Sequence, residues 1–174
     1  IAGTQALGSL KVIYDDNRIS IEGDTHYTFT EDVSARYKAY GWNVIEVAAK
    51  SDGDVDRDAL EKAMDAALLE VNRPTLIRLK SIIAWPAPKA RNTAKSHGSA
   101  LGADEITETK KLLNLPEEDF YFPDDLRSHL ANLQIRNQEL RTSWNSDFKS
   151  WESGNAERTT LLKRLRAGEL PAGW

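Results

Sequence analysis

The chain has 174 residues, of which 40% are hydrophobic and 29% are charged, and its formal net charge is −4. This composition is typical of a globular domain with its own core, and the small negative charge excludes a general affinity for nucleic acid or anionic membranes. Cysteine is absent, which excludes disulfides and thiolate chemistry. The sequence has no signal-peptide pattern and no apolar run of about 18 residues, so we expect a soluble, cytoplasmic protein without nucleic acid or membrane as partners.

The first elements in chain order end in a polar cluster. Residues 1–8 have the pattern of the last turns of a helix stopped by a glycine, and the apolar run 10–15 predicts a strand covered on both faces. Asp15-Asp16-Asn17 close this strand, where open parallel sheets bind ligands, and their oxygens suit Mg²⁺ or Ca²⁺. The same three residues are also typical of an ordinary turn, because such side chains bond their own backbone. The residues alone leave both interpretations open.

Two helices and two further strands follow. A helix is expected over 30–41, a strand over 42–47, a helix over 58–71 and a strand over 75–83. Short connections between alternating strands and helices predict a parallel sheet with right-handed crossovers. One face of the second helix is expected to lie in the core, and it carries Leu60, Met64, Leu68 and Val71.

The second half of the chain is mostly helical. Residues 84–97, rich in proline and polar residues, are expected to be irregular, and a short helix is expected over 104–113. Apolar residues then recur at steps of three and four over 126–151, which predicts a long amphipathic helix. A last helix is expected over 155–167, before Gly168.

The segment Tyr14-Asp-Asp-Asn-Arg-Ile-Ser-Ile-Glu-Gly23 resembles the second half of the thiamine diphosphate motif of transketolases. The resemblance continues in order to the C-terminal residues and is strongest to actinobacterial members. It is carried by Glu31-Asp32-Val33, Arg36-Tyr37, Ala39-Tyr40-Gly41-Trp42, Arg73-Pro74-Thr75-Leu76-Ile77, His97-Gly98, Leu101-Gly102 and Leu170-Pro171-Ala172-Gly173-Trp174.

This resemblance implies the fold class: α/β, with a parallel βαβαβ part of the diphosphate-binding domain followed by a helical connector. Residues 1–102 would be the C-terminal part of that domain, and 103–174 the helical segment leading to a pyrimidine-binding domain. Transketolases are several times longer, and their metal-binding Gly-Asp-Gly would lie before residue 1. We therefore expect a fragment, a split subunit or part of a larger protein, which by itself is incomplete as an enzyme.

The resemblance also implies site residues, with thiamine diphosphate and Mg²⁺ (or Ca²⁺) as cofactors. Asn17 and the backbone carbonyl of Ile19 match metal ligands, and Ile21 and Ile83 match residues that pack against the thiamine. His97 matches a catalytic histidine that contacts the diphosphate and the donor-sugar hydroxyl, although a lone loop histidine is by default a surface residue. Parallel strands independently bring the segments after the first and third strands to one edge of the sheet.

The implied activity is transfer of a two-carbon ketol unit from a ketose phosphate to an aldose phosphate, in the pentose phosphate pathway. The implied partners are sugar phosphates, the remaining transketolase segments and a second subunit of a homodimer. Ala84 departs from the family, where glycine is common. The alternatives are a related thiamine diphosphate enzyme such as dihydroxyacetone synthase, or a non-catalytic assembly module of the same fold. The joint presence of Asn17, Ile19 and His97 disfavours the module.

Overall fold

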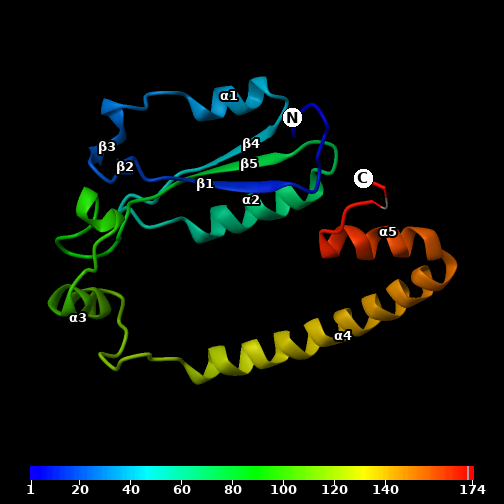
Figure 1. The fold of residues 1–174 in the computed structure, drawn as a ribbon. Helices are drawn as coiled ribbons and strands as arrows, with labels where there is room; N and C mark the ends of the chain where they lie inside the picture. Colours follow the sequence, from blue (N-terminus) through cyan, green and yellow to red (C-terminus); the bar gives the residue numbers. More distant parts are fainter. Residues whose placement is uncertain (172) are drawn as a thin grey trace. The chain divides into compact units, whose positions relative to one another are not determined.

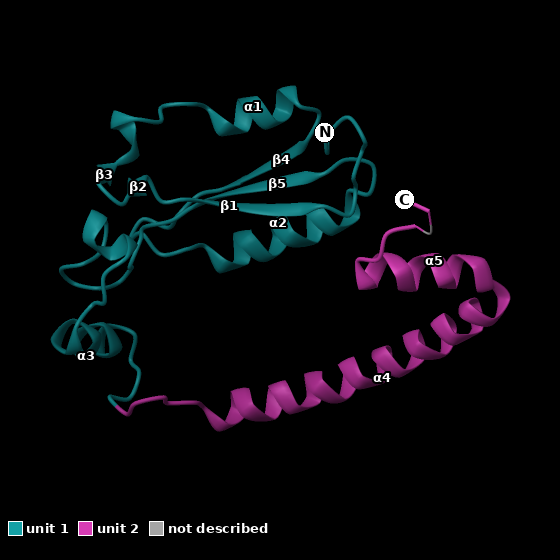
Figure 2. Ribbon diagram, in the orientation of Figure 1, with its two compact units in different colours: residues 1–117 teal, residues 118–174 magenta. Residues whose placement is uncertain are grey.

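The computed structural model describes residues 1–171 and 173–174 (Figure 1). The chain divides into two compact units, 1–117 and 118–174, which are described separately (Figure 2). The functional boundary predicted after residue 102 is a different division of the chain, and it stays a prediction.

The first unit contains a three-stranded parallel sheet in the order β1-β5-β4. Its strands are β1 (Lys11–Asp16), β4 (Asn43–Val47) and β5 (Thr75–Lys80). Asp16 lies opposite Lys80 at the carboxyl end of the β1–β5 pair. The predicted parallel α/β fold is confirmed, although the last strand ends at Lys80 and not at residue 83.

Helices α1 (Val33–Ala39) and α2 (Arg57–Leu69) lie on opposite faces of this sheet (Figure 1). Each begins after an aspartate whose side chain accepts a backbone N–H of the first turn: Asp32 from Ala35 at 3.0 Å, and Asp56 from Ala59 at 2.9 Å. These N–H groups have no partner within the helix, so the caps fix where both helices start.

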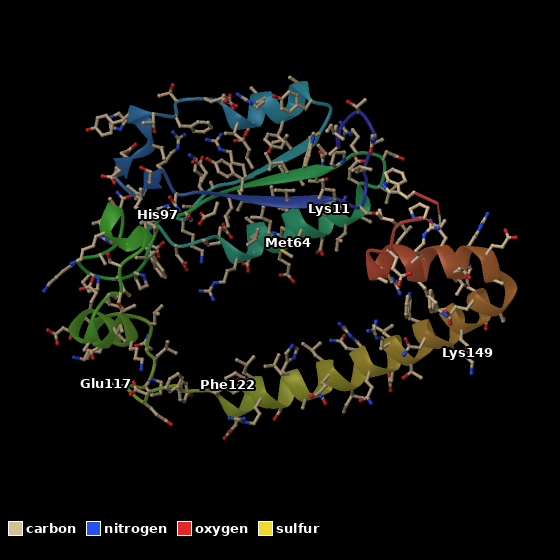
Figure 3. The ribbon with its side chains drawn as sticks, in the orientation of Figure 1. Lys11, Met64, His97, Glu117, Phe122 and Lys149 are labelled. Atoms are coloured by element: carbon tan, nitrogen blue, oxygen red, sulfur yellow. The ribbon has the colours of Figure 1, made fainter. Side chains whose placement is uncertain are left out.

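The core face predicted for α2 is correct at Leu60, which packs against the buried cluster, and wrong at Met64, Leu68 and Val71. The buried cluster between α2 and the sheet consists of Val47, Ala63, Ala67 and Ile77. The side chains of Met64 and Leu68 are 46% and 68% exposed instead. Figure 3 shows Met64 pointing away from the sheet. Alanine allows the helix to approach the sheet closely, so Ala63 and Ala67 face inward beside Leu60, and Met64 and Leu68 point away.

Strand β1 is not covered on both faces in the described residues, contrary to the expectation. It pairs on one side with β5, and Ile13 is 49% exposed. The residues before it, 1–8, form turns and not the end of a helix.

Short elements surround the carboxyl edge of the sheet. A hairpin of β2 (Ile19–Ser20) and β3 (Gly23–Asp24), which the sequence did not predict, leads into the 3₁₀ helix η1 (Thr25–Tyr27). After β5 come the 3₁₀ helix η2 (Ala94–His97) and α3 (Ala103–Leu112).

The second unit is a pair of helices, α4 (Asp124–Gly154) and α5 (Ala156–Ala167). As predicted, α5 stops at Gly168, whose φ of 70° is in the left-handed region. Trp144, Phe148 and Trp151 stack in a row along α4, with ring centroids 4.9 Å and 5.5 Å apart. In the part of the chain that the structure describes, no helix is long and apolar enough to cross a membrane.

Candidate cofactor site at the carboxyl edge of the sheet

Asn17 forms a turn directly after β1. Its Oδ1 accepts the backbone N–H of Ile19 at 2.9 Å, and Arg18 between them has a φ of 64°. The carbonyl of Arg18 accepts the N–H of Thr25 at 2.9 Å, which ties the turn to η1. The turn interpretation is therefore confirmed. It does not exclude a ligand role, because a carboxamide oxygen has two lone pairs and the turn uses one.

Asp16 is the charged centre behind this turn. Its side chain is 3% exposed, and its Oδ2 lies 2.7 Å from both Arg78 Nη2 and Lys80 Nζ. Its Oδ1 lies 2.9 Å from Arg18 Nε. Burial raises the pKa of Asp16, but hydrogen bonds and positive charge from Lys80 and Arg78 outweigh burial and lower that pKa below its ordinary value. Asp16 is thus held as a carboxylate that anchors the strand ends and Arg18.

Asp15 braces the turn from the other side. Its carboxylate accepts the hydroxyl of Ser81 and lies 3.5 Å from the side-chain nitrogen of Asn17. Both aspartates are therefore engaged by protein donors. No group of three or more His, Cys, Asp or Glu side chains that could hold a metal occurs among the described residues.

The resemblance assigns two oxygens of this turn to a metal, Oδ1 of Asn17 and the backbone carbonyl of Ile19. Both are hard donors, which suits Mg²⁺ or Ca²⁺, but octahedral Mg²⁺ takes six ligands. The donor chemistry of this turn therefore fits the metal, and the number of donors is too small to hold it without further ligands.

The segment after β5 brings His97 to this turn. Residues 84–93 are irregular, as predicted, whereas 94–97 form the short helix η2. Backbone bonds such as Asn92 N–H to the carbonyl of Ile83 at 3.0 Å fix the path of the irregular part. Helix η2 lies in contact with β2, so exposed His97 at the end of η2 is brought to the hairpin that carries buried Ile19 (Figure 3). The two segments predicted to share one edge of the sheet do share it.

The other predicted residues are placed differently. Ile83 is half-buried at the start of the loop after β5, whereas Ile21 is 69% exposed at the tip of the hairpin. The remaining two histidines do not form part of this cluster: His26 Nδ1 lies 2.9 Å from Asp24 Oδ1 in an exposed pair, and His129 is exposed on α4.

The sequence analysis did not identify two residues that contribute to the structure of this site. Arg78 is one of them: Arg78 and Lys80 alternate with apolar residues in β5, and a cation in a buried strand indicates a carboxylate partner. Glu105 is the other, and its side chain accepts two backbone N–H groups of the loop after β5. No sequence pattern that we recognise indicates that contact.

An open parallel sheet whose polar loops meet at its carboxyl edge defines a ligand-binding α/β domain. Residues 1–171 match the family model described as "Transketolase, thiamine diphosphate binding domain", and the chain therefore belongs to the transketolase family.

Similar proteins agree with this assignment. The transketolase of Mycobacterium leprae is 43% identical over the whole chain, and the chloroplastic transketolase of Solanum tuberosum is 41% identical. The transketolase structure of Leishmania mexicana matches 99% of the chain with 30% identity and a TM-score of 0.85. A Pichia stipitis transketolase in complex with sedoheptulose 7-phosphate matches with 37% identity and a TM-score of 0.83. The chain spans about a quarter of these relatives, 24% of the Mycobacterium leprae protein and 25% of each structure.

Proposed function

We propose that this chain forms part of the thiamine diphosphate site of a transketolase. The assembled enzyme would transfer a two-carbon ketol unit from a ketose phosphate to an aldose phosphate. The observation that carries the proposal is the contact of η2, which ends at His97, with β2, which begins at Ile19 directly after the Asn17 turn. A Pichia stipitis relative with a bound sugar phosphate supports the substrate class.

In this proposal Asn17 Oδ1 and the carbonyl of Ile19 would hold Mg²⁺ (or Ca²⁺), which would supply positive charge for the diphosphate. Bound thiamine diphosphate supplies the carbanion stabilisation that cleavage of carbon–carbon bonds requires. Asp16 and its cations keep the turn in place, so that the two oxygens are presented without reorganisation. Further metal ligands come from other segments of the enzyme, because the turn offers too few.

His97 is assigned to the diphosphate and to a hydroxyl of the donor sugar. An imidazole can donate a hydrogen bond to a phosphate oxygen or move a proton near neutral pH. Ile21 and Ile83 form apolar walls that exclude water from the thiamine. The high exposure of Ile21 supports this role, since an apolar side chain at a hairpin tip gains from a bound ring.

The wider setting is proposed on the same basis: a homodimer in the cytoplasm, acting in the pentose phosphate pathway. Dihydroxyacetone synthase would use the same cofactor, and the names of the relatives favour transketolase over it. A non-catalytic assembly module would have no need for His97 beside the Asn17 turn.

The test is ketol transfer by the complete enzyme that contains this chain, with its other segments in one polypeptide or supplied separately. His97→Ala should lower turnover about 10- to 150-fold, the worth of one hydrogen bond to a charged group. His129→Ala, on exposed α4, is the matched control and should leave turnover unchanged. Full activity of His97→Ala would remove this residue from the site.

A further inference from the structure

Glu105, in the first turn of α3, holds the loop that precedes His97. Its Oε1 accepts the backbone N–H of Lys89 at 2.6 Å and that of Ala90 at 2.8 Å. Hydrogen bonds to an ionised carboxylate are shorter and about twice as strong as neutral ones. One side chain thus ties α3 to a loop about 15 residues earlier in the chain.

The same residue, Ala90, continues the connection toward His97 through its carbonyl. The carbonyl of Ala90 accepts the hydroxyl of Thr93 at 2.7 Å and also the hydroxyl of Ser96. The two hydroxyl oxygens are themselves 3.2 Å apart. Ala90 is therefore held at its N–H by Glu105 and at its carbonyl by the residue next to His97.

Packing alone does not fix this loop. A cavity of about 290 Å³ lies between it and α3, and Thr93, Ser96, Leu101 and Glu105 are among the residues that line it. A side chain beside unfilled space lacks the dispersion contacts that hold a close-packed core in one arrangement. His97 itself is exposed, so its position depends on the backbone of η2.

We propose that Glu105 is a positioning residue for His97. Through Ala90 and Ser96 it holds η2 against β2, so that the imidazole faces the cofactor and the donor sugar. The inference rests on the proposed function of His97. It assigns Glu105 no contact with cofactor or substrate.

The experiment compares variants of the complete enzyme in ketol transfer. Glu105→Ala removes both hydrogen bonds and should lower turnover about 10- to 100-fold, as expected when the group that orients a functional side chain is lost. Glu105→Gln keeps an oxygen acceptor and should recover most of that loss. Glu108→Ala is the matched control on α3, because Glu108 is exposed and pairs only at the surface with Lys111, and it should have no effect.

The decisive readout is coupling to His97. If Glu105 acts through His97, Glu105→Ala in a His97→Ala background should cost no more than a factor of about two, whereas independent effects would multiply. Ser96→Ala removes the hydrogen bond to the carbonyl of Ala90 and should show the same coupling to His97. Because this change is smaller, it provides the test if Glu105→Ala does not fold.

The outcomes separate the two proposals. A His97→Ala variant with normal turnover overturns the role of His97, and the positioning role with it. A slow His97→Ala variant beside a normal Glu105→Ala variant overturns only the positioning role. Multiplicative losses, or a Glu105→Gln variant as slow as Glu105→Ala, overturn it as well.

Discussion

Asp16 is the residue on which the geometry of the candidate site depends most. It is buried, and three cations, two from β5 and one from the turn, converge on its two oxygens. Removing one partner of a buried ion pair leaves the opposite charge buried without compensation, and the protein loses more stability than the pair itself contributes. Part of this cost is screened here, because Lys80 and Arg18 are 39% and 49% exposed.

Asp16→Asn should therefore lower the free energy of unfolding by about 3 kcal/mol, at the lower end of the range for buried pairs. The measurement is urea denaturation of the complete enzyme near neutral pH, with Asp65→Asn on the exposed side of α2 as the matched control. The control should change stability by less than about 0.5 kcal/mol. Equal midpoints for the two variants would contradict this account of Asp16.

The same residue predicts a pH dependence. Its pKa is lowered in the folded protein from an ordinary value of 3.8, so its stabilising contribution is fully present above pH 3.8. That contribution is lost as the pH falls through the lower folded-state pKa. The stability difference between the wild type and Asp16→Asn should thus be constant above pH 3.8 and shrink as the pH falls below it.

At the scale of elements, the loop after β5 contains an alanine, Ala84, in a backbone conformation that is unfavourable for alanine. Ala84 has a φ of 57°, in the left-handed region, which costs a residue with a Cβ roughly 1–2 kcal/mol. Glycine adopts this region freely, and this explains physically why glycine suits the position.

Ala84→Gly should be neutral or stabilise the complete enzyme by up to about 1 kcal/mol, since relief of strain offsets the added freedom of the unfolded chain. Ala66→Gly, at an exposed position within α2, should instead destabilise by about 1 kcal/mol. Denaturation midpoints check both changes, and an equal loss at the two positions would show that Ala84 is not strained.

The order and direction of the strands could be predicted from the sequence, but the packing of the helices on the sheet could not. The parallel strands followed from β-branched runs and short connections, and that topology was enough to place Asn17 and the His97 loop at one edge. The inward face of α2 followed only at Leu60, because the stripe that continues through Met64 and Leu68 is as regular as that of Ala59, Ala63 and Ala67. The choice between two such stripes depends on how closely the helix fits the sheet, and periodicity does not contain that information. The hydrogen bonds of Glu105 are likewise tertiary contacts without a local pattern.

At the scale of the whole molecule, the first unit leaves apolar surface exposed. One edge of β1 is unpaired in the described residues, and Leu68 on the outside of α2 and Val71 just after this helix are 68% and 69% exposed. The chain spans 24% of its Mycobacterium leprae relative. We propose that the remaining transketolase segments cover these surfaces and supply the missing metal ligands.

The most direct test of the central claim is calorimetric titration of thiamine diphosphate into the complete enzyme, with Mg²⁺ and with EDTA. The account predicts binding that requires the metal and that Asn17→Ala weakens severely, because a lost carboxamide oxygen is not easily replaced in an octahedral site. Asn145→Ala, exposed on α4, should bind as the wild type does. Metal-independent binding, or an unchanged affinity of Asn17→Ala, would contradict the assignment of this edge of the sheet as the cofactor site.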